Sequence, residues 1–310
     1  MQRIHYLGHI ATYDNRRSFK RAIIATERLV QQNGDLAQPV LWTHEGADQD
    51  GIGAMKFLSE FLLAKGLRPR IVTGPVLFTA RPLAATLGID IDECNGDSQG
   101  MHFVLDTSAR PLLNGALGNL KPLRTTVIDH HVQDATSIEA RYRIINLRAR
   151  STCEILASLV LEDRIGEGGA FALAVGIASD SQRLSTAERH TILTYKRLLA
   201  RAHVQNQNEV EELADPQWDA RIRAVVARDL ENISRGNYKR ITYAIGLSNL
   251  ETPFILADTL RRMEMDISAA LCEIGTGMYK LSFRSGIANV HANEIARRTS
   301  ELCEMPEEMH

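Results

Sequence analysis

The sequence predicts an α/β fold built on a mainly parallel sheet that is flanked by helices. Short apolar runs alternate with longer segments whose apolar residues recur at helical spacing. The short runs are apolar throughout, which is typical of strands that are covered on both faces of a sheet. Three of these runs are followed by an acidic or imidazole side chain. Because ligands bind at the carboxyl ends of the strands in such sheets, this edge is the first place to expect a site.

Strands and helices alternate in the first half of the chain. Phe19, Ile23 and Leu29 recur at helical spacing in an expected helix over residues 15–33, which Asn33-Gly34 ends. Four short apolar runs predict strands, at residues 39–43, 70–73, 101–105 and 125–128. Further helices are expected at residues 51–65, 152–162 and 170–178.

The pattern changes in the last third of the chain. Residues 187–235 are polar, carry mixed charges and predict helices. Beyond Gly236 the apolar residues alternate, which predicts strands at 239–245 and 279–284 with a helix at 253–264 between them. We therefore expect a first domain over residues 1–190, a helical connector over 191–235 and a smaller α/β domain over 236–310.

Composition narrows the classes of function. The chain has 310 residues and a net charge of -2, so no global basic field attracts long nucleic acid. The four cysteines are scattered without a CxxC pair, which favours reduced thiols over a disulfide framework or a zinc site: Cys94, Cys153, Cys272 and Cys303. The start of the chain lacks the apolar core of a signal peptide, and no apolar stretch approaches the roughly 18 residues of a membrane span. We expect a cytoplasmic protein without a membrane partner.

Side chains that bind metals gather at four points of the chain. Three points follow the expected strands at 39–43, 101–105 and 125–128, and the fourth follows the helix at 170–178. In order, the groups are His44, Asp48 and Asp50, which the helix start Gly51 follows; Asp106; Asp129, His130 and His131; and Asp180. Each group also has a structural interpretation, since the aspartates are common caps and two adjacent histidines are ordinary in a loop.

The mixture of carboxylates and imidazoles defines the kind of ion that the four points together would bind. Hard oxygen ligands with two or more imidazoles suit Mn²⁺ or a similar divalent ion, and the absence of thiolates argues against structural zinc. There are carboxylates enough for two ions, at a separation of roughly 3.5–4 Å in two-metal centres. Such centres act on phosphorus esters, which makes a phosphoesterase the leading interpretation.

The four segments, in this order, resemble motifs I to IV of the DHH phosphoesterase superfamily. This superfamily includes RecJ exonucleases, phosphoesterases of short oligonucleotides and nucleotides, and family II pyrophosphatases. The resemblance covers residues 38–200 and includes the helix start Ser151-Thr152-Cys153-Glu154. One departure is Gly46, where RecJ-type members often carry an additional acid.

The resemblance implies a role for each side chain. One Mn²⁺ would be held by His44, Asp48 and Asp106, and a second by Asp50, Asp106, His130 and Asp180, with Asp106 bridging the two. Mg²⁺ or Co²⁺ would fit the same ligands. His131 would face the substrate phosphate, and Asp129 would orient the histidines from behind. The expected catalytic group is Asp50, Asp106, Asp129 and His131.

The last part of the chain resembles the DHHA1 substrate domain, through Arg284-Ser285 and Ile295-Ala296. This resemblance implies that Arg284 and Ser285 bind substrate. Arg297 and Arg298 are further candidates for phosphate contact, or ordinary solvated surface. The glycine-rich loop that follows in the family is not found in residues 297–310. Either the chain is truncated there or this branch binds its substrate differently.

The expected function is therefore a Mn²⁺-dependent phosphoesterase of the exonuclease type. It would hydrolyse phosphodiester or phosphomonoester bonds of short oligonucleotides or small nucleotides, by a hydroxide that two metal ions activate. Near-neutral charge disfavours a processive exonuclease on long DNA, and no Lys/Arg-rich motif of a pyrophosphatase is found. The alternative is a non-catalytic member that binds a nucleotide or a protein partner. Homodimerisation is a further hypothesis.

Overall fold

The chain divides into two compact units, Met1–Gln217 and Trp218–His310. The computed structural model describes residues 10–89, 99–113, 120–133, 137–216, 218–250, 252–287, 290 and 292–303. Cys94 and the segment after Cys303 lie outside the described residues. No described cysteine forms a disulfide, and no described helix combines the length and the apolar character that a membrane crossing requires.

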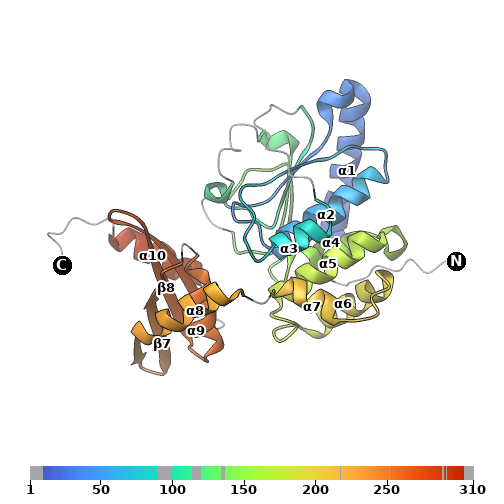
Figure 1. Ribbon diagram of the computed structural model, residues 1–310. Helices are drawn as coiled ribbons and strands as arrows, with labels where there is room; N and C mark the ends of the chain where they lie inside the picture. The colour runs from blue at the N-terminus through green and yellow to red at the C-terminus, as the bar shows by residue number, and fades with distance from the viewer. Residues whose placement is uncertain are drawn as a thin grey trace. The chain divides into compact units, whose positions relative to one another are not determined.

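A parallel sheet of five strands forms the centre of the first unit (Figure 1). Its strands are β1 (Val40–Trp42), β2 (Arg70–Val72), β3 (His102–Leu105), β4 (Thr125–Asp129) and β5 (Tyr142–Ile145). They lie in the order β2-β1-β3-β4-β5, and every neighbouring pair is parallel. The strand order places β1, β3 and β4 side by side, so their carboxyl ends meet at one edge. The α/β fold class that the sequence predicts is confirmed.

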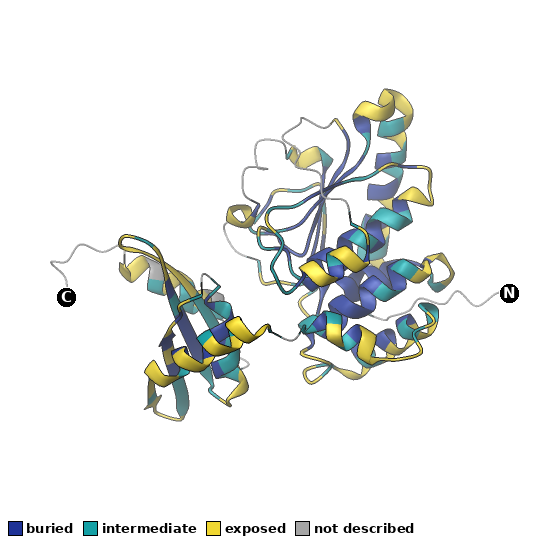
Figure 2. Cartoon of the chain, viewed as in Figure 1, coloured by how far each residue is buried: buried dark blue, intermediate teal, exposed yellow. Residues whose placement is uncertain are grey.

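Helices bury one face of this sheet. The first unit contains α1 (Tyr13–Asn33), α2 (Gln49–Leu63), α3 (Arg81–Thr86), α4 (Thr152–Leu159), α5 (Glu167–Asp180), α6 (Arg189–Arg201) and α7 (Asn208–Ala214). Side chains of α1, α2, α4 and α5 pack with Leu41, Phe103 and Ile128 in the larger core. A smaller core on the opposite face contains Trp42 and Val127, because successive strand residues point to opposite sides. The sheet and the inner helices are accordingly buried (Figure 2).

The second unit is a smaller α/β fold. It contains α8 (Ala220–Asp229), β6 (Ile233–Tyr238), β7 (Ile241–Leu247), α9 (Phe254–Arg262), β8 (Ile267–Gly275), β9 (Met278–Ser285) and α10 (Ala292–Cys303). The strands lie in the order β6-β7-β8-β9, with β7 and β8 parallel and the outer pairs antiparallel. Leu256 and Leu260 of α9 pack on Ala244 and Ala270 of the sheet. Short 3-10 helices of the two units lie at Gly34–Ala37, Arg110–Leu112, Pro122–Arg124, Glu162–Arg164 and Leu230–Asn232.

The structure differs from the sequence-based expectation in the connector and in three strands. The helices expected as a separate connector are divided, since α6 and α7 pack on α5 of the first unit whereas α8 belongs to the second. β5 and β6 are edge strands with charged or polar residues, which edges tolerate and which weaken the strand signal. The buried centre of β8 holds Ala269 and Ala270, and alanine has a low strand propensity.

Candidate metal centre

The loop from β1 to α2 carries the first two candidate ligands, His44 and Asp48, and the first turn of α2 carries the third, Asp50. Asp48 caps α2, because its Oδ1 accepts hydrogen bonds from the amides of Asp50 at 3.0 Å and Gly51 at 3.1 Å. The structural interpretation of Asp48 therefore holds alongside any role as a ligand. His44 Nδ1 lies 3.0 Å from the carbonyl oxygen of Glu45, and a bond there leaves Nε2 turned toward the carboxylates. Nε2 lies 3.9 Å from Asp48 Oδ1.

Asp106 lies at the centre of the cluster, directly after β3. Its carboxylate is buried between two imidazoles: Oδ2 lies 3.5 Å from His44 Nε2, and Oδ1 lies 3.5 Å from His130 Nε2. The backbone of Asp106 is left-handed, with φ at 61°, a conformation that aspartate adopts more readily than most side chains. Its amide still donates to the carbonyl of Ile128 at 3.0 Å, so β4 holds this turn in place.

Asp50 is a residue of the first turn of α2, and its side chain is fully buried. Its carboxylate lies against the amino end of another helix, α4. Its two carboxylate oxygens accept hydrogen bonds from the amides of Thr152 at 2.6 Å and Cys153 at 2.9 Å. Helix amino ends favour negative charge, so α4 stabilises this carboxylate. The hydroxyl of Thr152 also donates to Asp106 Oδ1 at 3.2 Å.

Thr152 is a residue of the site whose role the sequence does not predict. The available signal was the capping box that begins α4, in which the amide of Glu154 donates to Ser151 Oγ at 3.0 Å and the amide of Arg150 donates to Glu154 Oε2 at 2.9 Å. This pattern locates a helix amino end, where amides are free to hold an anion. Only the tertiary structure shows that the carboxylate of Asp50 is the group that these amides hold.

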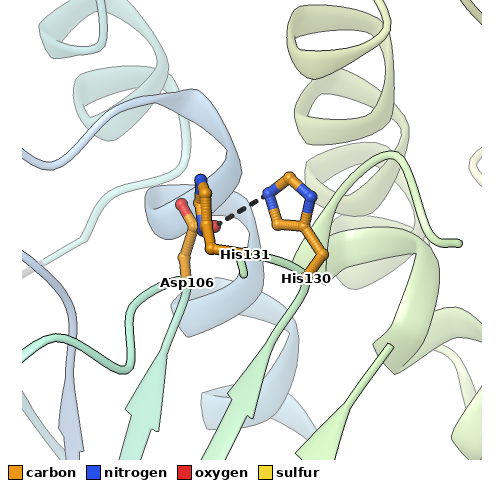
Figure 3. Close-up of side chains that lie close together, drawn as sticks. All are labelled: Asp106, His130 and His131. Carbon is orange, nitrogen blue, oxygen red and sulfur yellow. Dashed lines mark ion pairs between the residues drawn. The ribbon is translucent and has the colours of Figure 1, made fainter. Parts of the chain in front are cut away.

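His130 and His131 follow the end of β4, and their side chains lie close to Asp106, to which the ion pair of His130 is drawn (Figure 3). His130 Nε2 lies 3.2 Å from Asp180 Oδ2, 3.5 Å from Asp106 Oδ1 and 3.9 Å from Asp50 Oδ2. His131 is half exposed, with 51% of its side chain accessible, and its Nδ1 lies 2.8 Å from Asp129 Oδ1. The same oxygen accepts the amides of His130 at 2.8 Å and His131 at 3.2 Å. Buried Asp129 therefore orients both histidines.

The carboxylates and imidazoles change one another's pKa. Burial and the neighbouring carboxylates raise the pKa of Asp48 to about 7 and raise the pKa of Asp50 well above its usual range. Burial disfavours the charged form of His44, but its contact with Asp106 and the charge of Asp48 outweigh this and raise its pKa to about 10. Burial also works against a charged Asp106, yet His130 and His44 hold its pKa well below the usual range. Two of the groups of potential metal ligands together contain four carboxylates and two imidazoles: Asp48, Asp50, Asp106 and Asp180, with His44 and His130. Because the carboxylates repel one another, a bound cation would stabilise their charged forms.

The donor atoms fit divalent ions. Among the described residues, three groups have one ligand atom from each residue within 4.8 Å of all the others: His44, Asp48 and Asp106; Asp50, Asp106, His130 and Asp180; and Asp106, His130 and His131. Asp106 belongs to all three groups. His130 Nε2 is buried beside the carboxylates of Asp180 and Asp106, but no contact among the described residues has the geometry of a hydrogen bond, so this nitrogen is suited to bind a cation together with those carboxylates. The donors are hard oxygens and imidazole nitrogens, a set that suits Mn²⁺ or Mg²⁺ with histidine.

Two of the expected substrate-binding residues, Arg284 and Ser285, belong to the second unit, whereas His131 belongs to the first. Arg284 lies in β9, and its Nε donates to Asp258 Oδ1 of α9 at 2.5 Å. Ser285 Oγ accepts the amide of Ile287 at 3.2 Å. On α10, Arg297 and Arg298 form ion pairs with Glu294, and Arg297 also pairs with Glu301. Each of these residues is engaged within its own unit, so a role in substrate binding stays a prediction.

Comparisons with known proteins identify the fold. No family model matches the sequence. The structure resembles an exopolyphosphatase-related protein from Bacteroides fragilis, with a TM-score of 0.67 and 17% identity over 93% of this chain and 87% of that chain. It also resembles a DHH domain from a member of the s1p family of ribosomal proteins, with a TM-score of 0.55 and 12% identity over 96% of this chain and 85% of that chain. The chain has the DHH superfamily fold.

Two further comparisons cover only about half of the other protein. RecJ from Thermus thermophilus, in a complex with Mn²⁺, matches with a TM-score of 0.51 and 14% identity over 96% of this chain and 51% of that chain. By sequence, an uncharacterized protein of Methanocaldococcus jannaschii is 29% identical over 154 residues, which are 48% of this chain and 46% of the relative. The match thus spans about half the length of that relative.

Proposed function

We propose that this DHH-fold chain is a metal-dependent phosphoesterase. The observation that carries the proposal is the position of Asp106, whose two carboxylate oxygens each face one imidazole, His44 on one side and His130 on the other. This arrangement supports two adjacent cation sites that share one carboxylate. The Mn²⁺ in RecJ of Thermus thermophilus, a protein of the same fold, supports Mn²⁺ as the ion, with Mg²⁺ or Co²⁺ as substitutes.

The ligand sets follow from the two larger groups of donors. His44, Asp48 and Asp106 would hold one ion, and Asp50, Asp106, His130 and Asp180 the other. When bound, two such ions activate a water molecule for attack on phosphorus and neutralise charge on the phosphoryl oxygens. The protein holds the ligands rigid, since α4 fixes Asp50 through two amides and Thr152 fixes Asp106.

We propose that His131 acts on the substrate. Its Nδ1 side faces the buried carboxylate of Asp129. Burial disfavours an imidazolium there, but the hydrogen bond with Asp129 outweighs it and raises the pKa of His131. We propose that the charged ring turns its Nε2–H toward a phosphoryl oxygen or the leaving oxygen. There it would stabilise developing negative charge or donate a proton.

The substrate class that we propose is a short oligonucleotide or a small nucleotide, cleaved at a phosphodiester or phosphomonoester bond. Exposed His131 and partly exposed Asp48 leave the cluster open to a phosphate group. Arg284 and Ser285 of the second unit are proposed to contact the substrate, although Arg284 would first have to release or share Asp258. The second candidate is a non-catalytic chain that binds a nucleotide or a protein partner at the same fold.

A panel of substrates tests the proposal. The purified chain is incubated with a dinucleotide, a five-nucleotide RNA, adenosine 3′,5′-bisphosphate and pyrophosphate, each with EDTA, Mn²⁺, Mg²⁺ or Co²⁺. We expect Mn²⁺-dependent release of product that Asp106→Ala abolishes and that Asp163→Ala, an exposed aspartate of the same unit, retains. Calorimetric binding of Mn²⁺ without turnover on any substrate would favour the non-catalytic alternative. Turnover that persists in Asp106→Ala would refute the site.

A further inference from the structure

A second concave site lies in the first unit, at the amino ends of the parallel strands. The cavity has a volume of about 800 Å³ and is lined by α1 and by residues at the starts of β3, β4 and β5. The candidate metal ligands lie at the other end of the strands. Because a strand rises about 3.3 Å per residue, β4 alone separates the two sites by roughly 13 Å.

Four arginines line this cavity, and none of the described residues that line it is acidic. Arg21 and Arg28 come from α1, and Arg124 and Arg141 stand directly before β4 and β5. Among the described residues, none of the four forms an ion pair with an acidic side chain. Within the described part of the chain, two contacts of these arginines involve neutral groups: Arg124 donates to the carbonyl of Gln99 at 2.5 Å, and Arg141 lies over the ring of Tyr142, 5.4 Å from its centroid.

Exposed arginines elsewhere in the chain form ion pairs with nearby carboxylates. On α10, Arg297 and Arg298 both pair with Glu294 three or four residues away. Arg21 and Arg28 lie seven residues apart on one face of α1 with no such partner in the cavity. Four like charges in one cavity repel one another, and the chain as a whole has a net charge of -2. A polyanion in the cavity would relieve this repulsion and accept charge-assisted hydrogen bonds.

The rest of the cavity wall is apolar or aromatic. It contains Ile24, Leu29, Met101, Leu123 and the ring of Tyr142, next to the amide side chain of Gln32. An aromatic ring with aliphatic neighbours is suited to stack on a nucleobase, and a polar amide can bond its edge. The volume lies within the usual range for small-molecule sites. Phosphate-binding arginines beside an apolar wall are what a phosphorylated nucleoside requires.

We propose that this cavity binds a nucleoside polyphosphate, at a site separate from the metal centre. The arginines hold the phosphate groups, and the Tyr142 side of the cavity holds the base. This site does not depend on the proposed phosphoesterase activity, because none of its lining residues belongs to the candidate metal ligands. A single-stranded nucleic acid laid along α1 is the competing ligand, since Arg17 and Lys20 line a neighbouring cavity of the same helix.

Isothermal titration calorimetry with ATP in EDTA tests the proposal on the full chain. Without divalent ions, we expect ATP to bind with 1:1 stoichiometry. The double variant Arg28→Ala/Arg141→Ala should bind ATP about tenfold or more weakly, because it loses charge-assisted hydrogen bonds. Arg28 and Arg141 are exposed, so the fold should persist, which thermal melting verifies. Arg68→Ala is the matched control, since Arg68 is an exposed arginine just before β2 that does not line the cavity.

Two further titrations separate this site from its alternatives. Asp106→Ala should bind ATP as the native chain does, and loss of ATP binding in that variant would assign ATP to the metal centre instead. Tripolyphosphate and a twelve-nucleotide single-stranded DNA are the comparison probes. Tripolyphosphate that binds as tightly as ATP would overturn the assignment of a nucleoside. DNA that binds more tightly than ATP, and that loses affinity in Arg17→Ala/Lys20→Ala, would overturn the nucleotide site in favour of nucleic acid.

Discussion

Replacing Thr152 with valine tests how the chain positions Asp106. Thr152 is fully buried, its hydroxyl donates to Asp106 Oδ1 at 3.2 Å, and its amide donates to Asp50 Oδ2 at 2.6 Å. Valine has nearly the same shape and keeps the amide, so the change removes only the hydroxyl bond. A hydrogen bond to a charged group contributes about 1.5–3 kcal/mol. Since partners of metal ligands typically change affinity by about 10- to 100-fold, we expect Mn²⁺ affinity to fall by that amount.

Calorimetric titration with Mn²⁺ measures this effect, and kcat/KM on the best substrate of the panel should fall in parallel. The matched control is Thr126→Val in β4, where the buried hydroxyl has no hydrogen-bond partner. That variant should bind Mn²⁺ as the native chain does and should be as stable or more so. If Thr152→Val also binds Mn²⁺ with native affinity, Thr152 does not hold Asp106 in a binding geometry and the reasoning is wrong.

Three other predictions follow from the geometry of the metal centre. Asp129→Asn removes the carboxylate that raises the pKa of His131. We therefore expect kcat to drop and the alkaline limb of the pH–kcat profile to move to lower pH. An unchanged profile would argue against a protonated His131 in the reaction. Gly176→Ala would press a Cβ against Cys153 Sγ and place it 3.0 Å from Asp50 Oδ1, so we expect a loss of about 1–3 kcal/mol in unfolding free energy, measured by urea denaturation. Mn²⁺ must displace protons, since the pKa of Asp48 is raised to about 7, so affinity should rise with pH through neutrality. Calorimetry in buffers of different ionisation enthalpy measures this proton release, and its absence at pH 6 would contradict the raised pKa.

The sequence predicted elements best where their patterns are local and strong. The four apolar runs that became β1 to β4 were recognisable because both faces of these strands are buried. β5, with the sequence Tyr-Arg-Ile-Ile, lies at the sheet edge, where burial is partial and the apolar pattern is correspondingly weak. β8 has two alanines and a cysteine among its central residues and becomes a strand through its pairing with β7 and β9. Edge position and pairing partners are properties of the folded sheet, which a single segment does not encode.

The same distinction applies to the candidate metal centre. Asp48, Asp106 and His130 could be named from the sequence because each follows a recognisable strand, and strand ends in a parallel sheet are natural ligand positions. The sequence did not predict the contribution of Thr152, which lies 46 residues from Asp106 and reaches it only when α4 packs near β4. A capping box in the sequence predicts where such a helix begins. Which residue the start of the helix contacts depends on how the helix packs in the folded chain.

The sequence by itself determined which residues could act as ligands, the elements that carry them, and the resemblance to the DHH superfamily. Only the tertiary structure decided that Asp106 lies between His44 and His130, and that Arg28 of α1 shares a cavity with Arg141 before β5. The physical reason is the distance along the sequence between the residues that interact. Helix and strand patterns depend on neighbours a few residues apart, whereas the two ends of a sheet collect side chains from distant segments according to strand order and helix packing.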